Sequence, residues 1–233
     1  TVDDSLKLQL DVDTFAARRF TAVLQRYRSV WTGRVAQMAP RLAVWNCELS
    51  AGSVEASLYA MWVNHLYALV FPNGARPPLE VLLRALESGI DRRRELADAA
   101  EQAWRDLEKR FGPDALTWSW GRLHTLTFRH PLDAQAWSRG PLPRPGDATT
   151  PNATGGSQFR QMNGASYRQI INLADWDRSI VTNAPGESGN PASPHYSDLL
   201  EPWAAGRYHP LPYSRRAVLA ALSNTIVLRP ARR

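Results

Sequence analysis

The stretch SVEASLYAMWVNHLYALVFPNG, residues 53–74, has the pattern of one long amphipathic helix with both of its ends marked. Ser53 is a residue type that caps helix N-termini, and the turn-forming Phe-Pro-Asn-Gly of residues 71–74 closes the pattern. We therefore predict a helix from Ser53 to about residue 70 with one apolar face. That face consists of Val54, Leu58, Met61, Trp62, Leu66 and Leu69.

Three more helices are predicted on either side of this one, at residues 14–35, 78–86 and 91–110, each with apolar residues along one side. Thr14 can cap the first, and Pro78 suits the first turn of the second. Pro and Gly are sparse up to residue 110 (four of each) and dense beyond it (thirteen Pro and ten Gly). We therefore predict a helical lobe over residues 1–112.

The second half of the chain is expected to contain strands, turns and loops. Strands are predicted at 118–128, 166–173, 178–183 and 225–228, with a long loop rich in Pro, Gly, Thr and Asn at 141–161. Helices are expected at 193–205, where Ser193 can act as a cap, and at 215–223. The predicted fold class is α+β, with a β-rich segment over residues 113–233 after the helical lobe.

The composition excludes several classes of protein. The 233 residues are 44% hydrophobic, which is enough for a packed core. No run of 18 apolar residues would span a membrane, and no segment resembles a secretory signal peptide. The net charge of +6 comes from arginines spread along the chain, so we expect no nucleic-acid partner. Cys47 is the only cysteine, which excludes an internal disulfide and a cysteine-rich metal site.

Thr1 has the residue type of a self-processed hydrolase nucleophile, whose own α-amine acts as the base. Such a residue has to open a strand that is buried in a sheet. Here Thr1 is followed by Val-Asp-Asp-Ser, which is typical of the start of a helix. We therefore do not assign Thr1 as a nucleophile.

The remaining polar candidates are histidines and aspartates. No pair of histidines has the helical spacing with a carboxylate that a metal site of the His-Glu-x-x-His type needs, and we expect no metal or other cofactor in this span. Asp175, Asp177 and Asp198 could pair as acid and base, but Asp175-Trp176-Asp177 is equally consistent with a turn between two strands. The histidines are His65, His124, His130, His195 and His209.

The segment from Asn183 to Tyr196 is rich in Gly, Pro, Ser and Asn. Its small residues would let the backbone approach a neighbouring segment closely. We interpret it as a turn-rich loop between a strand and a helix.

Several separated motifs occur in an order that resembles the penicillin acylases (penicillin amidases), which are N-terminal-nucleophile hydrolases. Each motif is short, and their joint order over nearly the whole chain carries the resemblance to the C-terminal part of the family's β chain. The motifs are Leu8-Gln-Leu-Asp11 with Thr14, Trp45-Asn46 with Ser53 and Trp62, Trp118-Ser-Trp-Gly121 with His124 and His130-Pro131, Gly146-Asp147 with Thr150, Ser166-Tyr-Arg168, Pro185-Gly-Glu-Ser-Gly-Asn190, Ser193-Pro-His-Tyr196 and Trp203-Ala-Ala-Gly206.

The chain departs from the family pattern at three positions that are not catalytic. Glu187 stands where Gln is common, Leu199 where Gln often follows the Asp, and Asn46 where Asp is usual. These departures weaken only an assignment to a subfamily.

The resemblance implies a hydrolase of linear amides that is made as a self-cleaving precursor. An N-terminal serine of the larger chain attacks the amide carbonyl, with its own α-amine as the base, in an αββα core. The nucleophile, the oxyanion-hole asparagine and the calcium ligands of the family lie upstream of the segment that matches here. No catalytic, cofactor-binding or metal-binding residue is therefore carried over to this chain, and the fragment alone is expected to be inactive.

The resemblance also implies partners and a location. The partners would be the α chain and the N-terminal part of the β chain of the same precursor, together with a small amide substrate, in the periplasm or outside the cell. His195 is expected to brace the sheet, so that His195→Ala impairs maturation more than turnover. The alternative is a stand-alone helical-plus-β interaction module whose Trp-rich surface binds a partner.

Overall fold

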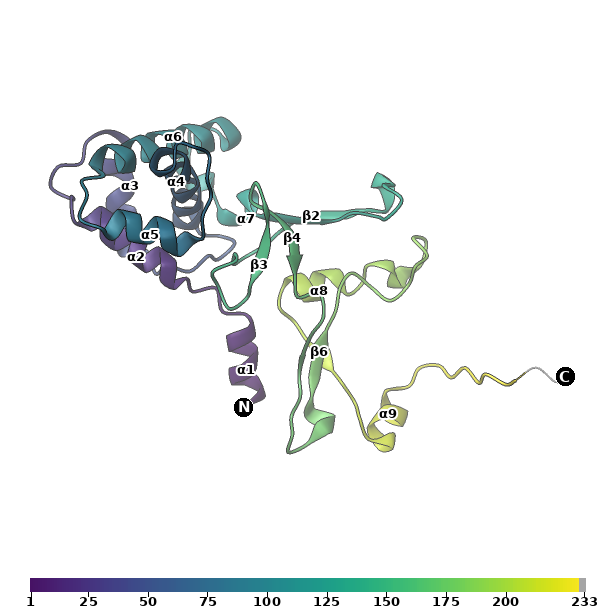
Figure 1. Cartoon of the computed structure of the whole chain (residues 1–233). Helices are drawn as coiled ribbons and strands as arrows, with labels where there is room; N and C mark the ends of the chain where they lie inside the picture. The colour runs from purple at the N-terminus through teal and green to yellow at the C-terminus, as the bar shows by residue number, and fades with distance from the viewer. Residues whose placement is uncertain (231–233) are drawn as a thin grey trace. The chain divides into compact units, whose positions relative to one another are not determined.

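A computed structural model describes residues 1–230, and the chain divides into two compact units (Figure 1). The larger unit comprises Gln9–Gly164, and the smaller unit combines Thr1–Leu8 with the chain from Ala165 onward. This division differs from the one expected at residue 112. Trp118, Trp120 and Leu123 belong to the same buried cluster as the helices, so the strands that follow them stay in the larger unit.

The larger unit begins with helices. These are α2 Phe15–Gln25, α3 Gly33–Val44, α4 Val54–Val70, α5 Leu79–Glu87, α6 Arg93–Phe111 and the short α7 Trp120–Leu123. Thr14 Oγ1 accepts a hydrogen bond from Ala17 N (3.4 Å), and Ser53 Oγ accepts one from Ala56 N (3.1 Å). Both predicted N-caps are therefore confirmed, as are the helices that became α4, α5 and α6.

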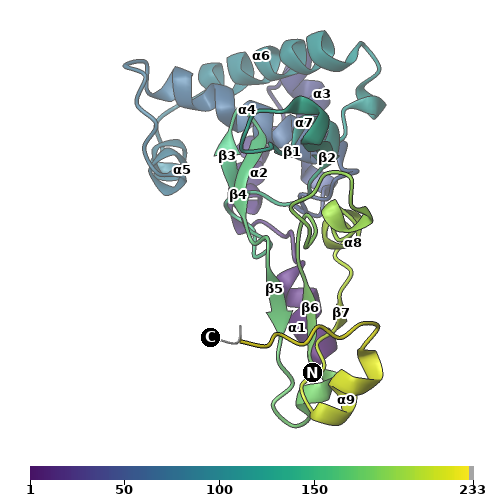
Figure 2. The ribbon, with the colours of Figure 1, turned by 90° about the vertical axis from the view of Figure 1, so that its right-hand side faces the viewer.

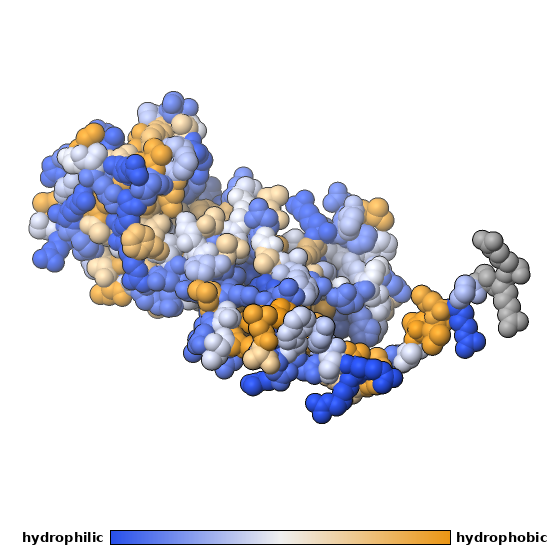
Figure 3. All heavy atoms as spheres, turned by 60° about the horizontal axis from the view of Figure 1, so that its bottom comes forward, coloured by the Kyte–Doolittle hydropathy of each residue, from blue (hydrophilic) through white to orange (hydrophobic). Residues whose placement is uncertain are grey.

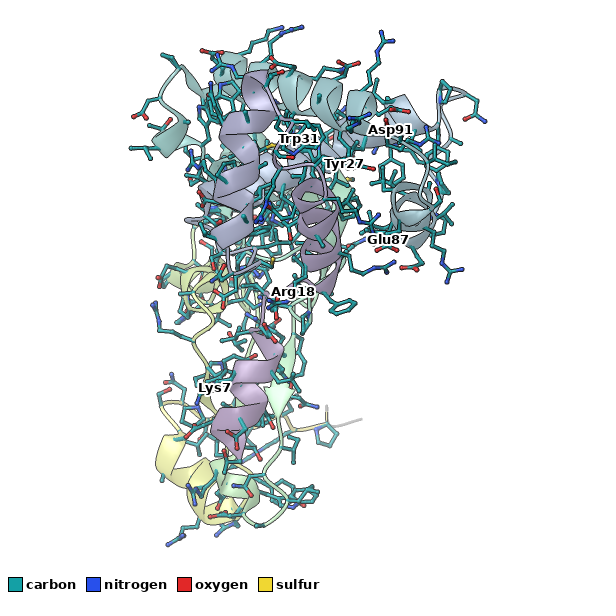
Figure 4. The ribbon with its side chains drawn as sticks, turned by 90° about the vertical axis from the view of Figure 1, so that its left-hand side faces the viewer. Lys7, Arg18, Tyr27, Trp31, Glu87 and Asp91 are labelled. Carbon is teal, nitrogen blue, oxygen red and sulfur yellow. The ribbon has the colours of Figure 1, made fainter. Side chains whose placement is uncertain are left out.

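The prediction of a single helix over 14–35 is wrong, because α2 ends at Gln25 and a new helix, α3, begins at Gly33. Trp31 Nε1 donates to the carbonyl of Leu24 near the end of α2 (3.0 Å). The Trp31 ring lies edge-on to Tyr27 at 5.7 Å, and Figure 4 shows the two side chains next to each other. Glu101 of α6 accepts from Arg34 N (2.6 Å) and so caps the new helix.

The core of the larger unit forms where α4 packs against α6 and α2. Trp62 is fully buried and donates through Nε1 to the Leu96 carbonyl (3.1 Å). Phe20 of α2 meets Trp62 and Tyr59 edge-on, with ring centroids 6.0 and 5.8 Å apart. The apolar face predicted for residues 53–70 is therefore the centre of this core, except that Leu69 is only partly buried.

A four-stranded sheet completes the larger unit. Its strands are β1 Thr125–Phe128, β2 Arg139–Pro143, β3 Thr154–Ser157 and β4 Arg160–Gly164, in the order β2-β1-β4-β3. The pairing of β1 with β4 is parallel and the other two pairings are antiparallel.

Two predictions for this region are wrong in part. Residues 118–123 are not strand, because Trp118 and Trp120 turn into the helical core before β1 begins. The expected loop over 141–161 contains β3 and the ends of β2 and β4. A Cβ on Gly156 would overlap the Arg160 carbonyl, so the hairpin of β3 and β4 needs a glycine there.

The smaller unit contains α1 Val2–Gln9, which extends one residue into the larger unit, and the antiparallel sheet β5-β6-β7 (Figure 2). Its strands are β5 Arg168–Ile170, β6 Ile180–Thr182 and β7 His209–Pro210, and its other helices are α8 Leu200–Ala204 and α9 Arg215–Ala221. The expected strands at 166–173 and 178–183 and the helix at 215–223 are present in shorter form.

Of two other predictions for the smaller unit, one is wrong in part and one is wrong. The helix expected over 193–205 is a 3-10 turn at Pro194–Tyr196, which Ser193 caps as predicted, followed by α8. The strand expected at 225–228 has no regular structure, and no described strand pairs with it. Across residues 1–230, helices and two small sheets give the α+β class that the sequence predicts, and none of these helices is long and apolar enough to cross a membrane.

Candidate functional site

Four of the sequence motifs meet at one place in the larger unit, which we call the motif junction. Trp120 N donates to the Ser53 carbonyl (2.8 Å), and Gly121 N donates to the Ala51 carbonyl (2.7 Å). Trp120 Nε1 donates to the Gly146 carbonyl (3.1 Å). A Cβ on Gly121 would lie 2.8 Å from the Pro143 Cβ. The residues of the motif at 118–121 therefore lie in close backbone contact with the start of α4 and with the loop at Gly146.

The loop that follows Gly146 is held by its own side chains. Thr150 Oγ1 accepts from Asp147 N (3.1 Å), and Asp147 Oδ1 accepts from both N and Oγ1 of Thr149 (2.6 Å each). The Thr149 hydroxyl has a single proton, which it donates to Asp147. In the bond between the Thr14 and Thr149 hydroxyls (2.7 Å), Thr14 is therefore the donor and Thr149 Oγ1 the acceptor. Asn152 N also donates to the Asp11 carbonyl (2.8 Å), which ties the motif of residues 8–14 to this loop.

A pocket of about 270 Å³ opens beside the motif junction. Its aromatic lining comes from Tyr59, Tyr67, Trp120 and Phe159, and its charged lining from Arg76, Asp147 and Arg160. Burial raises the pKa of the Tyr59 phenol well above its ordinary value, so this hydroxyl stays protonated. The pocket residues come from distant parts of the sequence, and only the resemblance drew attention to Trp120 and Asp147 beforehand.

His124 lies in the motif junction as a neutral side chain. It is buried, its ring stacks on Trp120 at 4.7 Å, and desolvation lowers its pKa. Nδ1–H donates to the Arg144 carbonyl (2.8 Å), since a carbonyl can only accept. Nε2 is then the acceptor for the Thr154 hydroxyl (3.3 Å). Both ring nitrogens are used, so His124 is a structural histidine and not a free base.

The other histidines do not come together. His65 pairs with Asp106 (2.9 Å), His195 with Asp198 (2.8 Å), and His130 Nδ1 accepts from Leu132 N (3.2 Å). Among residues 1–230, no three His, Cys, Asp or Glu side chains gather as metal ligands would.

The aspartates of the smaller unit serve as turn and cap residues. Asp175 Oδ1 accepts from Asp177 N (3.2 Å) at the start of a 3-10 turn between β5 and β6, which agrees with the turn interpretation. Asp177 accepts from Tyr213 N (2.9 Å), Ser214 N (2.7 Å) and Ser214 Oγ (2.6 Å), and these bonds lower its pKa. Asp177 therefore holds the start of α9, a role that no sequence signal indicated.

Thr1 lies in an exposed position in this chain. Its hydroxyl donates to Asp4 Oδ2 (2.7 Å) in the first turn of α1. The side chains of Thr1 and Asp4 are both largely exposed. Thr1 precedes the helix α1 and does not open a strand.

The later motifs of the sequence meet in the smaller unit. Arg168 is buried, donates through Nη2 to the Trp203 carbonyl (2.6 Å), and has its guanidinium over the Trp203 and Tyr208 rings at 5.4 and 5.5 Å. Trp203 Nε1 donates to the Ala165 carbonyl (3.0 Å). The segments at 166–168 and 203–206 are therefore two halves of one packing contact.

The loop from Asn183 to Tyr196 makes the close approach that its glycines indicate. Ser188 N donates to the His195 carbonyl (3.1 Å), and a Cβ on Gly186 would overlap that same oxygen. The His195 ring itself is mostly exposed. The described contact at this position is therefore made by the backbone, and it joins two parts of the same loop.

Tryptophan does not form an exposed surface. Trp62, Trp104, Trp118, Trp120 and Trp203 are buried, and only Trp137 and Trp176 are classed as exposed. This distribution disfavours the alternative of an interaction module with a Trp-rich surface.

Comparison with known proteins places this arrangement in a family. A family model described as penicillin amidase matches residues 1–220. The chain is 30% identical over 230 residues to "Penicillin acylase 2 proenzyme" of Pseudomonas sp. strain SE83, which covers 84% of this chain and 29% of that protein. It is 37% identical over 139 residues to "Acyl-homoserine lactone acylase QuiP" of Pseudomonas putida, covering 56% of this chain and 16% of that protein.

A solved structure has a similar fold. The thermostable penicillin G acylase from Alcaligenes faecalis aligns with a TM-score of 0.52 at 16% identity, covering 96% of this chain and 48% of that chain. The chain thus spans less than a third of these two curated relatives and about half of the solved chain. Because the family model matches nearly the whole sequence, the chain belongs to the penicillin amidase family.

Proposed function

We propose that these residues are the C-terminal part of the β chain of a self-processed amidohydrolase. The protein would hydrolyse a linear amide through an N-terminal serine that lies outside this span. The observation that carries the proposal is the family match over 1–220, combined with coverage of less than a third of the two curated relatives. The relatives are named as acylases of penicillins and of acyl-homoserine lactones, so both are candidate substrate classes.

The proposed chemistry divides between this span and the rest of the protein. The upstream part would supply the serine, its α-amine as the base, an oxyanion hole and the calcium site, within an αββα core. The residues described here would position that machinery. In support, Asp147 and Thr149 are hydrogen-bonded to each other, and both ring nitrogens of His124 are used in hydrogen bonds within the unit. Export to the periplasm or medium is part of the same proposal.

An activity assay on the protein from its native source tests the proposal. Purified protein is incubated with penicillin G and with N-acyl-homoserine lactones of short and long chain, and the released amine and acid are measured. We expect amide hydrolysis by the native protein and none by residues 1–233 alone. Hydrolysis by the 233-residue chain alone would contradict the assignment of the nucleophile to another segment.

A further inference from the structure

The smaller unit buries few apolar side chains within residues 1–230. Its buried apolar residues are Ile170, Val181, Leu200 and Trp203, whereas the main buried cluster lies entirely in the larger unit. More than half of the large apolar side chains that are exposed belong to the smaller unit. Such a unit needs further apolar burial to hold a single structure.

The exposed apolar residues are concentrated at one end of the smaller unit. We call Val218, Leu219, Leu222, Ile226, Val227 and Leu228 the C-terminal strip. Leu228 is 91% exposed and Ile226 is 86% exposed, and no residue of α9 is buried. Figure 3 shows apolar atoms gathered on the chain just before its grey end.

The start of α9 is fixed even though its apolar side chains are uncovered. The Asp177 carboxylate accepts three hydrogen bonds from Tyr213 and Ser214. The rings of Trp176 and Tyr213 pack at 4.5 Å, and Ser214 Oγ caps the helix through Ala217 N (3.1 Å). A helix of seven residues does not persist in water by itself. The contacts at its start therefore fix α9, which carries Val218 and Leu219 of the strip.

The charge around the strip indicates what kind of surface it meets. Residues 202–230 contain four arginines and no Asp or Glu. Arg215, Arg216 and Arg229 form no ion pair with a carboxylate of residues 1–230, although the charge of Arg216 helps to lower the pKa of Asp177 at the start of α9. A second copy would place basic strip against basic strip in a symmetric contact, which disfavours self-association.

From these observations we infer that the C-terminal strip is a docking surface for another polypeptide segment of the same protein, one that presents an apolar surface with acidic residues. This inference rests on the proposed function, because that segment belongs to the part of the protein by which the relatives exceed this chain. The apolar side chains would supply the contact area, and the three arginines would pair with the acidic groups of the partner.

Side-chain labelling of the native protein tests whether the strip is covered. Carbene labelling of Leu228 and Leu219 is measured in the folded and the urea-unfolded protein, with Val44 of α3 as reference, since it is 87% exposed in this chain. We expect folding to reduce labelling of both leucines severalfold. Equal labelling of the leucines in the folded and unfolded protein would overturn the inference.

A pair of variants tests whether the strip holds the partner. Leu219→Asp should weaken the binding of the other segment to this chain by about tenfold or more, because a buried leucine becomes a buried charge. Val44→Asp is the matched control, and its binding of the other segment should be unchanged. Unchanged retention in Leu219→Asp would contradict the inference, as would a strip covered only in a homodimer or only on anionic vesicles.

Failure of the docking inference can be told apart from failure of the proposed function. A native protein that contains a further polypeptide and hydrolyses amides, but leaves the strip exposed, overturns the docking inference alone. A native protein that consists of this chain alone overturns both.

Discussion

His124, one of the five histidines that the sequence offers as polar candidates, has a structural role in the fold. It follows the Trp118–Gly121 motif, yet its two ring nitrogens are used by Arg144 and Thr154. Burial among these groups favours the neutral ring, because charging it would place a cation in a desolvated site.

The lowered pKa of His124 predicts a pH dependence of stability. The unfolded histidine takes up a proton near its ordinary pKa of 6.5, whereas the folded one resists protonation. Below that pH the unfolded state binds more protons, so the free energy of unfolding falls as the pH decreases from about 7.5 to 5. Urea unfolding across this range measures the slope. The free energy of unfolding should depend less steeply on pH in His124→Gln. An unchanged slope would contradict the assignment of a neutral His124 ring in the folded protein.

Gly186 is the residue at which the loop of the smaller unit is most sensitive to substitution. A Cβ there would meet the His195 carbonyl and the Tyr196 backbone, so Gly186→Ala should destabilise the fold by about 1–3 kcal/mol. Gly189 has nothing within 4 Å of its Cβ position, and Gly189→Ala should change stability by less than about 0.5 kcal/mol. Thermal unfolding of the native protein compares them. Equal effects would refute the close contact.

The effect of His195→Ala on maturation stays a prediction. The described contact of His195 with this loop is made by its carbonyl, which alanine keeps, and the ring has an exposed pair with Asp198. We therefore expect His195→Ala to slow maturation less than Gly186→Ala does. Gel analysis of precursor and processed chains checks this order, and the reverse order would show that the ring is needed.

At the scale of elements, α3 depends on a cap that comes from another helix. Glu101 of α6 accepts from Arg34 N at 2.6 Å, and Gly33 leaves room for its carboxylate. Glu101→Ala should cost about 1–2 kcal/mol, the usual loss for a helix cap. Glu108→Ala on the same helix is the control, since no side-chain bond of Glu108 is involved in a cap. Urea unfolding followed by tryptophan fluorescence compares them, and equal losses would rule out the capping role.

The start of α9 gives a second prediction at this scale. Asp177→Ala removes three hydrogen bonds to residues 213 and 214, so trypsin should cut after Arg215 and Arg216 faster than in the unchanged protein. Asp3→Ala, at an exposed position of α1, should leave the cutting rate as it was. Mass spectrometry of timed digests measures both rates. The same rate in Asp177→Ala would mean that other contacts hold the helix.

The helices and strands differ in how far their own sequence predicts them. Helices α4, α5 and α6 carry local signals, since each has a regular apolar repeat and a marked beginning or end. The break between α2 and α3 depends on Trp31 and Glu101, which act across the fold. Strands β3 and β4 are short and rich in glycine, and β4 pairs with β1 from far away in the sequence. The residues at 225–228 have strand propensity, but none of the strands within residues 1–230 pairs with them.

The motif junction could be predicted only in part for the same reason. The resemblance drew attention to the segments at 118–121 and 146–150, but short motifs do not state what they contact. Their contacts with one another depend on backbone hydrogen bonds and glycine positions in three dimensions. Tyr59 and Arg160 of the neighbouring pocket have no local signal at all.

At the scale of the whole molecule, the two units differ in how much they can stabilise themselves. Ordering the backbone costs about 1–2 kcal/mol per residue, and full burial of a large apolar side chain returns about 1.5–3 kcal/mol. The larger unit buries an extensive apolar core, whereas the smaller unit buries four apolar residues among residues 1–230. Of the two units, the smaller one therefore gains less stability from its own apolar burial.

The most direct test of the central proposition is the polypeptide composition of the protein from its native source. Intact mass and N-terminal sequencing of the purified protein show which chains it contains and where each begins. We predict a chain that extends upstream of residue 1 and begins with serine, held together with a second chain. A native protein made of these 233 residues alone, with Thr1 at its terminus, would contradict the account.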